Sequence, residues 1–380
     1  MHKALFLAGL TLCALTASAG RHIGFETDAF NRAYPVSYAK NMVFSPASFE
    51  IDCVLVAESL ATIPKANVSE MMGAVLGFES TYAPILEGLS VRTNGFSFLT
   101  ARGFCVPEMK NVRVDHRIYL SRTYGAEIMR KHPARGAESW FRASMDGEME
   151  DFNVTDDSSG GRRYSFYDLV SCKVAWRDPF PTGNTRELAF HRADDTNTVK
   201  VTCMSDVRVA DTWEADEYTL LRLPLRGDAW FYAALPKEGG DLTPVRSDFS
   251  SIEIDHLLTV MKSVTEKGVS HGPCAIVLPR LQLRSRLDFS GILRYFRIPT
   301  KGLVLIDEDA ASQEYVQHVR FSLTEHADGE APLVRKPDDE IVPLTPGVKR
   351  LVFNRPFLFF VYHEPTETIL AAGQFSGNGK

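Results

Sequence analysis

Residues Leu351–Val361 read LVFNRPFLFFV, and this stretch is the most informative part of the 380-residue chain. Apolar side chains stand at most positions, without the alternation that marks a strand with one face in water. The pattern indicates a strand that is entered through Pro356 and buried on both faces. We therefore expect a strand over Leu351–Tyr362, packed inside a large core.

The chain around this stretch predicts strands late and helices early. Helices are expected over Ser48–Leu60, where Ser48 would cap the first turn, and over Glu70–Leu76. Two alternating runs flank Arg226-Gly227-Asp228 and predict a hairpin. The other expected strands are Met42–Phe44, Tyr164–Trp176, Val199–Met204, Cys274–Leu283, Tyr315–Leu323 and Ile369–Phe375. This order indicates an α+β fold with antiparallel sheets.

Composition excludes several classes of function. The net charge is −6 at pH 7, whereas a nucleic-acid partner requires a basic surface. The sequence contains no zinc-binding His-Glu-x-x-His and no phosphate-binding loop. The ten histidines are scattered. We therefore expect neither an enzyme nor a metal or other cofactor.

The N-terminus has the pattern of a secretory leader. His2 and Lys3 precede an apolar run, Ala4–Leu15, that is too short to cross a bilayer, and small residues follow. We expect residues 1–19 to be a signal peptide and residues 20–380 a single exported domain that does not enter the membrane. The mature part keeps five widely spaced cysteines, which we expect to be buried thiols: Cys53, Cys105, Cys172, Cys203 and Cys274.

Several segments in the same order resemble the serpin family of serine protease inhibitors. Phe353–Phe359, FNRPFLF, matches the C-terminal motif of that family, and Asn41–Ser48, NMVFSPAS, resembles its strand-to-helix junction. Trp176–Phe180, WRDPF, followed by Thr185 and Phe190, resembles the tryptophan segment at the top of the central sheet. The resemblance covers roughly Phe25–Phe375.

This resemblance implies three mainly antiparallel β-sheets with surrounding helices and an exposed reactive loop near the C-terminus. A protease that cuts the loop would be trapped as the loop enters the central sheet as an extra strand. The resemblance also implies a polar cluster where that sheet opens, made of Asn41, Ser45, Ser48, Asp168 and His318. Asp168 stands where the family has asparagine, which could make sheet opening sensitive to pH.

The reactive loop is expected over about residues 325–350, with Glu325 as its hinge glutamate. The bait bond is expected at Leu344–Thr345, in an apolar context that suits a chymotrypsin-like or elastase-like protease. In the hinge, Gly329, Glu330 and Ala331 are the residues closest to the family's run of small side chains.

The rest of the loop departs from the inhibitory pattern. Arg335–Glu340, RKPDDE, is charged at every position except the proline. Alternate residues of a strand face opposite sides, so insertion in either phase turns charges inward. Burying an unpaired charge costs several kcal/mol, and Pro332 and Pro337 each remove a ladder donor. Two functions therefore stay open: a secreted inhibitor of a serine protease, and a non-inhibitory carrier, binding module or protease substrate.

Two further expectations concern partners. A basic run could bind a polyanion such as a glycosaminoglycan, although its spacing favours a solvated face. The arginines are Arg280, Arg284, Arg286, Arg294 and Arg297. We expect the protein to act as a monomer.

Overall fold

The computed structural model describes residues 24–33, 40–74, 77–90, 92–130, 134–154, 163–192, 198–240, 242–248, 251–262, 268–326 and 347–377. Residues 24–33 are helical. The other helices are α2 (Pro46–Glu58), α3 (Thr62–Met71), α4 (Phe78–Leu89), α5 (Val114–Tyr124), α6 (Ala134–Ser144), α7 (Thr243–Asp248), α8 (Ser251–Lys262) and α9 (Ser290–Tyr295), with short 3₁₀ turns η1 (Met109–Asn111) and η2 (Thr182–Asn184).

The strands follow the expected order but include several that the sequence did not predict. They are β1 (Met42–Phe44), β2 (Phe96–Val106), β3 (Ala126–Arg130), β4 (Arg163–Val174), β5 (Arg186–His191), β6 (Thr198–Glu214), β7 (Tyr218–Pro224), β8 (Ala229–Pro236), β9 (Val269–Pro279), β10 (Leu281–Asp288), β11 (Ala311–Leu323), β12 (Lys349–Val352), β13 (Phe357–His363) and β14 (Thr368–Phe375).

The strands form two hydrogen-bonded sheets within the described residues. A five-stranded sheet has the order β10-β11-β4-β2-β3, and a nine-stranded sheet has the order β1-β14-β13-β8-β7-β6-β9-β12 with β5 attached to β6. We expected three sheets. The long strand β6 pairs with β5 along its first residues, Thr198–Cys203, and with β7 at its end, Asp211–Glu214. It pairs with β9 over the length between, Cys203–Trp213, so β6 joins these ladders into one sheet.

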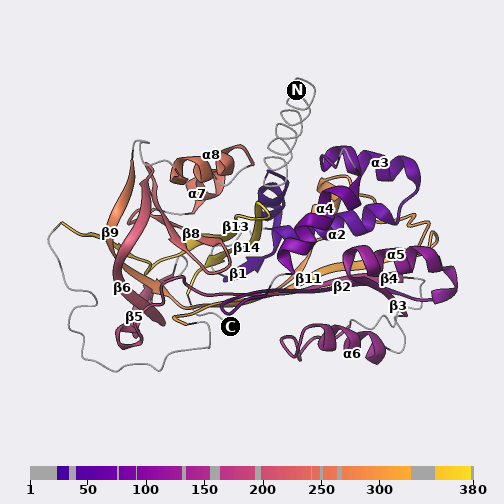
Figure 1. Ribbon diagram of the computed structural model, residues 1–380, viewed down its shortest axis with the longest axis horizontal. Helices are drawn as coiled ribbons and strands as arrows, with labels where there is room; N and C mark the ends of the chain where they lie inside the picture. The colour runs from indigo at the N-terminus through magenta and orange to yellow at the C-terminus, as the bar shows by residue number, and fades with distance from the viewer. Residues whose placement is uncertain are drawn as a thin grey trace, which may run out of the picture.

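The helices cover both faces of the five-stranded sheet (Figure 1). In that view α2 and α4 lie above β2, β4 and β11, and α6 lies below them. Phe141 of α6 packs with Phe152 and Tyr167 on the lower face. The larger core, on the other face, surrounds α2, whose residues are all buried.

Two predicted strands prove to be pairs of strands. The expected strand Leu351–Tyr362 is broken at Phe353–Pro356 into β12 and β13, which do not pair with each other. Pro356 lacks the N–H that a continuous ladder would need. The expected strand Cys274–Leu283 is broken at Arg280 into β9 and β10, which belong to different sheets. Apolar runs that are buried throughout do not reveal such breaks.

The C-terminal hairpin of β13 and β14 lies inside the nine-stranded sheet, between β1 and β8. β13 pairs antiparallel with both β14 and β8, and all its residues are buried. Phe360 stacks on Tyr232 of β8, with their ring centroids 4.5 Å apart. The β13 part of Leu351–Val361 is therefore buried on both faces, as its lack of alternation predicts.

Gly373 in β14 is required by the close approach of two neighbouring strands. A Cβ at this position would meet the carbonyl oxygen of Met42 and two Phe359 ring carbons at 2.8 and 2.9 Å. Gly373→Ala should therefore lower the free energy of unfolding by about 1–3 kcal/mol through overpacking. Chemical denaturation measures this loss. Gly136→Ala in α6 is the matched control, because nothing lies within 4 Å of its added Cβ, and an equal loss in both variants would contradict the explanation.

Candidate functional site

The seam between β4 and β11 is the only parallel contact in the middle of the five-stranded sheet, within the described residues. It runs from the pair Ala311–Arg163 to the pair Ser322–Lys173. Each of these strands is antiparallel to its other neighbour, β2 or β10. Parallel pairing is slightly less stable per residue than antiparallel pairing. The seam is thus the place where an additional strand could have antiparallel neighbours on both sides.

Gln317 joins the middle of this seam to the start of α2. It lies opposite Asp168 in the ladder, and its Nε2 donates to Asp168 Oδ2 at 2.9 Å. The same nitrogen donates to the carbonyl oxygen of Ser45 at 3.1 Å, while the Ser45 N–H donates to Gln317 Oε1 at 2.8 Å. All three residues are buried. A parting of β4 from β11 would have to break the Gln317–Asp168 bond.

The N-cap of α2 is Ser45, three residues before the cap that we expected at Ser48. The helix begins at Pro46, whose fixed φ suits the first helical position. Ser45 Oγ accepts from the Ser48 N–H at 3.4 Å and donates to the Leu370 carbonyl at 2.7 Å. Ser48 lies in the first turn instead, where its Oγ accepts from Arg102 Nη2 at 2.7 Å.

Three buried charged residues lie beside these hydroxyls. Arg102 of β2 has its Nε 3.4 Å from Asp52 Oδ1 and 3.7 Å from Asp168 Oδ1. Its side chain is 3% exposed, and both carboxylates are fully buried. Burial, and then the like charge of Asp168, raise the pKa of Asp52 well above its ordinary value. One arginine therefore faces two carboxyl groups, and the raised pKa of Asp52 favours a proton there, which would balance the charge.

His318 and Asn41 do not join this cluster. His318 faces the opposite side of the sheet, where its ring packs edge-on against Phe152 with centroids 5.2 Å apart. Burial lowers the pKa of His318 to about 4. Neighbouring residues of a strand face opposite sides, so Gln317 occupies the inward position that we assigned to His318. Asn41 binds the backbone of Ser376 and Gly377 through both ends of its amide.

Glu325 anchors the end of the seam from which the loop departs. Arg280 Nε donates to its two carboxylate oxygens at 2.9 and 2.8 Å, and Thr185 Oγ1 donates to Oε1 at 2.5 Å. The Glu325 side chain is fully buried and that of Arg280 is 9% exposed. Trp176 follows shortly after the end of β4, and its ring packs edge-on against those of Phe180 and Phe231. The resemblance pointed to Glu325, Thr185 and Trp176, but no pattern in the sequence indicates the contact between Arg280 and Glu325.

Most of the expected loop lies outside the described residues. This applies to the hinge positions Gly329, Glu330 and Ala331 and to the bait positions Leu344 and Thr345. The described chain stops at His326 and resumes at Gly347, and β12 then pairs parallel with β9. The two anchors of the loop are therefore defined.

Sequence reasoning missed Asp52, Arg102 and Gln317, although two of them carry a usable signal. Asp52 interrupts the apolar run Ile51–Val56, and Arg102 interrupts the apolar strand β2. A charge inside a run that must be buried requires a partner, because an unpaired buried charge is costly. The pairing itself is visible only once α2 lies on β2 and β4.

The basic run is largely neutralised. Arg280 binds Glu325, Arg284 lies 3.2 Å from Asp151, and Arg286 lies 2.7 Å from Glu314. Arg294 and Arg297 are exposed at and beyond the end of α9. The interpretation as a solvated, ion-paired face fits these contacts better than a single basic patch.

The five cysteines are free and buried, as predicted. Burial raises the pKa of the Cys172 and Cys203 thiols to about 12, which keeps them protonated and unreactive. The described residues contain no cluster of histidine, cysteine or acidic side chains suited to a metal ion. None of the described helices is both long enough and apolar enough to span a bilayer.

Comparison with known proteins identifies the family. The family model "Serpin (serine protease inhibitor)" matches residues 23–377. Human Serpin I2 is 22% identical over 388 residues, covering 95% of this chain and 92% of that protein. Human thyroxine-binding globulin bound to thyroxine has a TM-score of 0.79 at 15% identity and covers 97% of this chain and all of that one. Native protease nexin-1 with heparin gives 0.76 at 17% identity, covering 95% of this chain and 99% of that one. The five-stranded sheet, the nine-stranded sheet and these matches together show that the chain belongs to the serpin family.

Proposed function

We propose that this serpin is an extracellular inhibitor that traps a serine endopeptidase by offering the Leu344–Thr345 bond as a suicide substrate. The family description and the leader-like residues 1–19 support the proposal. The apolar residues around the bond favour a chymotrypsin-like or elastase-like enzyme. The protein itself performs no catalysis and acts as a monomer in this scheme.

The parallel β4–β11 seam is the observation that carries the proposal. A loop that leaves the end of β11 and turns back would run antiparallel to β11. Because β4 is parallel to β11, the same loop would also be antiparallel to β4. Insertion would replace one parallel contact by two antiparallel contacts. This gain would drive the loop into the sheet after a protease cuts it.

Glu325 would serve as the hinge of this movement. Its two bonds from Arg280 and one from Thr185 fix the end of β11 before the loop begins. The buried polar groups Ser45, Asp168 and Gln317 would hold the centre of the seam closed until cleavage.

A non-inhibitory role is the second candidate, and the charges of Arg335–Glu340 favour it. An inserted strand would turn inward either Arg335 and Asp339 or Lys336, Asp338 and Glu340, at several kcal/mol for each unpaired charge. A loop that cannot insert would simply be cut, and the protein would act as a substrate or a binding module. Human thyroxine-binding globulin, solved in complex with thyroxine, is a structural neighbour that binds a small molecule.

Incubation with chymotrypsin, elastase and trypsin separates the two candidates. The inhibitory proposal predicts a covalent complex with chymotrypsin or elastase that survives denaturing electrophoresis. Leu344→Arg should move complex formation to trypsin, because it changes only the residue that enters the specificity pocket. The triple variant Lys336→Ala, Asp338→Ala and Glu340→Ala should raise the fraction of protease trapped.

Clean cleavage by all three proteases without any complex, in both the wild type and the triple variant, would contradict inhibition and support the second candidate. A complex that forms equally well after Leu344→Arg would instead show that another bond is the bait.

A polyanion is a further partner class, since protease nexin-1 was solved with heparin. In this chain three arginines of the basic run are engaged by carboxylates. Binding there would have to exchange existing ion pairs for new ones, so its net gain would be small.

A further inference from the structure

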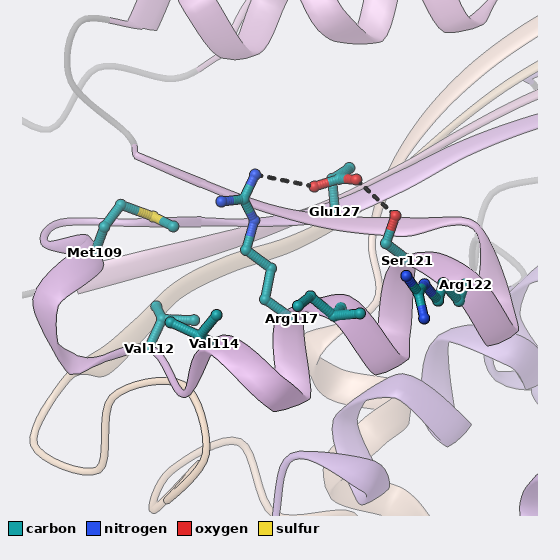
Figure 2. A pocket seen from close by; sticks show the side chains of 8 residues that line it. Met109, Val112, Val114, Arg117, Ser121, Arg122 and Glu127 are labelled. Carbon is teal, nitrogen blue, oxygen red and sulfur yellow. Dashed lines mark hydrogen bonds and ion pairs between the residues drawn. The ribbon is translucent and has the colours of Figure 1, made fainter.

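A pocket of about 540 Å³ opens beside α5, away from the β4–β11 seam (Figure 2). Its walls are η1, the outward face of α5 and the edge strand β3. Met109, Val112 and Val114 form one end, and Ser121, Arg122 and Glu127 form the other. Its volume falls within the range of small-molecule sites in proteins.

The apolar wall of this pocket is unusually exposed. Val114 is 71% and Ile118 is 46% exposed, and both are among the few large apolar side chains that the described surface leaves bare. They are four residues apart on α5 and so share one face of the helix. Covering apolar surface gains about 25 cal/mol per Å². An apolar occupant would therefore be stabilised by contact with both side chains.

Most charges around the pocket already have partners. Arg117 reaches across from α5 to Glu127, with 3.5 Å between Nη2 and Oε2, and Ser121 donates to the same carboxylate (Figure 2). Arg113 pairs with Asp115. Arg122 is the lining cation for which the described residues provide no ion pair. It continues the face of Val114 and Ile118, about 12 Å along the helix from Val114.

We propose that this pocket binds a long-chain carboxylate, an amphipathic organic anion. The acyl chain would lie along Val114 and Ile118, and the carboxylate would pair with the guanidinium of Arg122. Arginine binds carboxylates through two parallel N–H groups, which fixes the orientation of the ligand. A neutral ligand would cover the apolar wall but leave the guanidinium of Arg122 without a counterion. A cationic ligand would be repelled by Arg122.

The proposal is tested by titrating the full chain with dodecanoate and, separately, with dodecanol, each below its aggregation concentration. We expect saturable binding of one dodecanoate per chain. We expect dodecanol to bind about tenfold more weakly, because its neutral hydroxyl can accept at most one hydrogen bond from Arg122 and forms no ion pair. Arg122→Gln should weaken dodecanoate binding by a similar factor and leave dodecanol binding unchanged.

Ile118→Ser should weaken both ligands, since it removes apolar contact rather than charge. Arg113→Gln is the matched control, because Arg113 is an exposed arginine just before the same helix that lies outside the pocket lining. Absence of saturable binding, equal affinity for the two ligands, or an equal loss in Arg113→Gln and Arg122→Gln would each overturn the proposal. The result does not depend on whether the protein inhibits a protease.

Discussion

Glu325→Gln should lower the free energy of unfolding by about 3–5 kcal/mol, the usual cost of removing one partner of a buried ion pair. Arg280 is 9% exposed and directs its Nε at both oxygens of the Glu325 carboxylate. Glutamine keeps the size of the side chain but leaves the guanidinium charge uncompensated in the core. The amide oxygen of the glutamine can still accept the hydrogen bond from Thr185 Oγ1. The loss of stability therefore reflects mainly the missing charge. Equilibrium denaturation in urea measures the change.

A double-mutant cycle provides the control for this prediction. Arg280→Met combined with Glu325→Gln removes both charges, and the double variant should be more stable than the sum of the two single losses predicts. Arg92→Gln, which breaks an exposed ion pair with Asp146, should cost less than about 1 kcal/mol. A loss from Glu325→Gln as small as that from Arg92→Gln, or additive losses in the cycle, would show that the Glu325 anchor contributes little.

Asp168→Asn should stabilise the protein at alkaline pH, by about 1 kcal/mol or more near pH 8, because it removes one of two buried carboxylates that share a single arginine. Asparagine can still accept the hydrogen bond that Gln317 Nε2 donates to Asp168. The measurement is the free energy of unfolding of the wild type and the variant from about pH 5 to about pH 8. The difference between the two proteins should grow as the pH rises.

The sign follows from proton binding. Burial and the like charge of Asp168 raise the pKa of Asp52 in the folded protein, so the native state keeps a proton that the unfolded chain releases above about pH 4. Stability is therefore greatest in acid and is lost as the pH rises toward the raised pKa of Asp52. His318 acts in the opposite direction: its pKa is lowered to about 4, so protonation destabilises the native state as the pH falls below about 6.5. Comparison with the variant removes most of this second effect, because Asp168 is the smallest of the five causes that act on the pKa of His318.

Asp52→Asn is the matched variant, since it imitates the protonated carboxyl and should likewise reduce the pH dependence. Asp146→Asn at an exposed ion pair should leave the profile unchanged. If the wild type and Asp168→Asn differ by the same amount at every pH, the two carboxyl groups do not share a proton.

The scaffold was largely predictable because its longest apolar runs have strong local patterns. Leu351–Val361 marked the fully buried strand β13 of the nine-stranded sheet. The Arg226-Gly227-Asp228 turn joins β7 to β8 as a hairpin. Breaks inside buried runs escaped prediction, as at Arg280, because residues on both sides of the break are apolar. β2 was missed entirely, although it contains the charge that completes the buried cluster.

The polar cluster was predictable only in part, and a one-residue shift accounts for the principal error. Ser45, Ser48 and Asp168 do meet beneath the seam, but Gln317 occupies the position that we gave to His318. A shift of one residue in a strand moves a side chain to the other face, and sequence alone does not fix that register. Partners such as Arg102 are distant in sequence from Asp168, and only the folded sheet brings them together.

The thermal stability of the loop-cleaved protein tests the central claim most directly, namely that the β4–β11 seam accepts the loop as an additional strand. The protein is cut at Leu344–Thr345 with elastase, and its Tm is compared with that of the intact chain under identical conditions. Insertion predicts a Tm higher by at least about 10 °C, because a buried strand with two antiparallel neighbours adds several kcal/mol. An unchanged or lower Tm after complete cleavage, in the wild type and in the variant without charges at Lys336, Asp338 and Glu340, would contradict the claim.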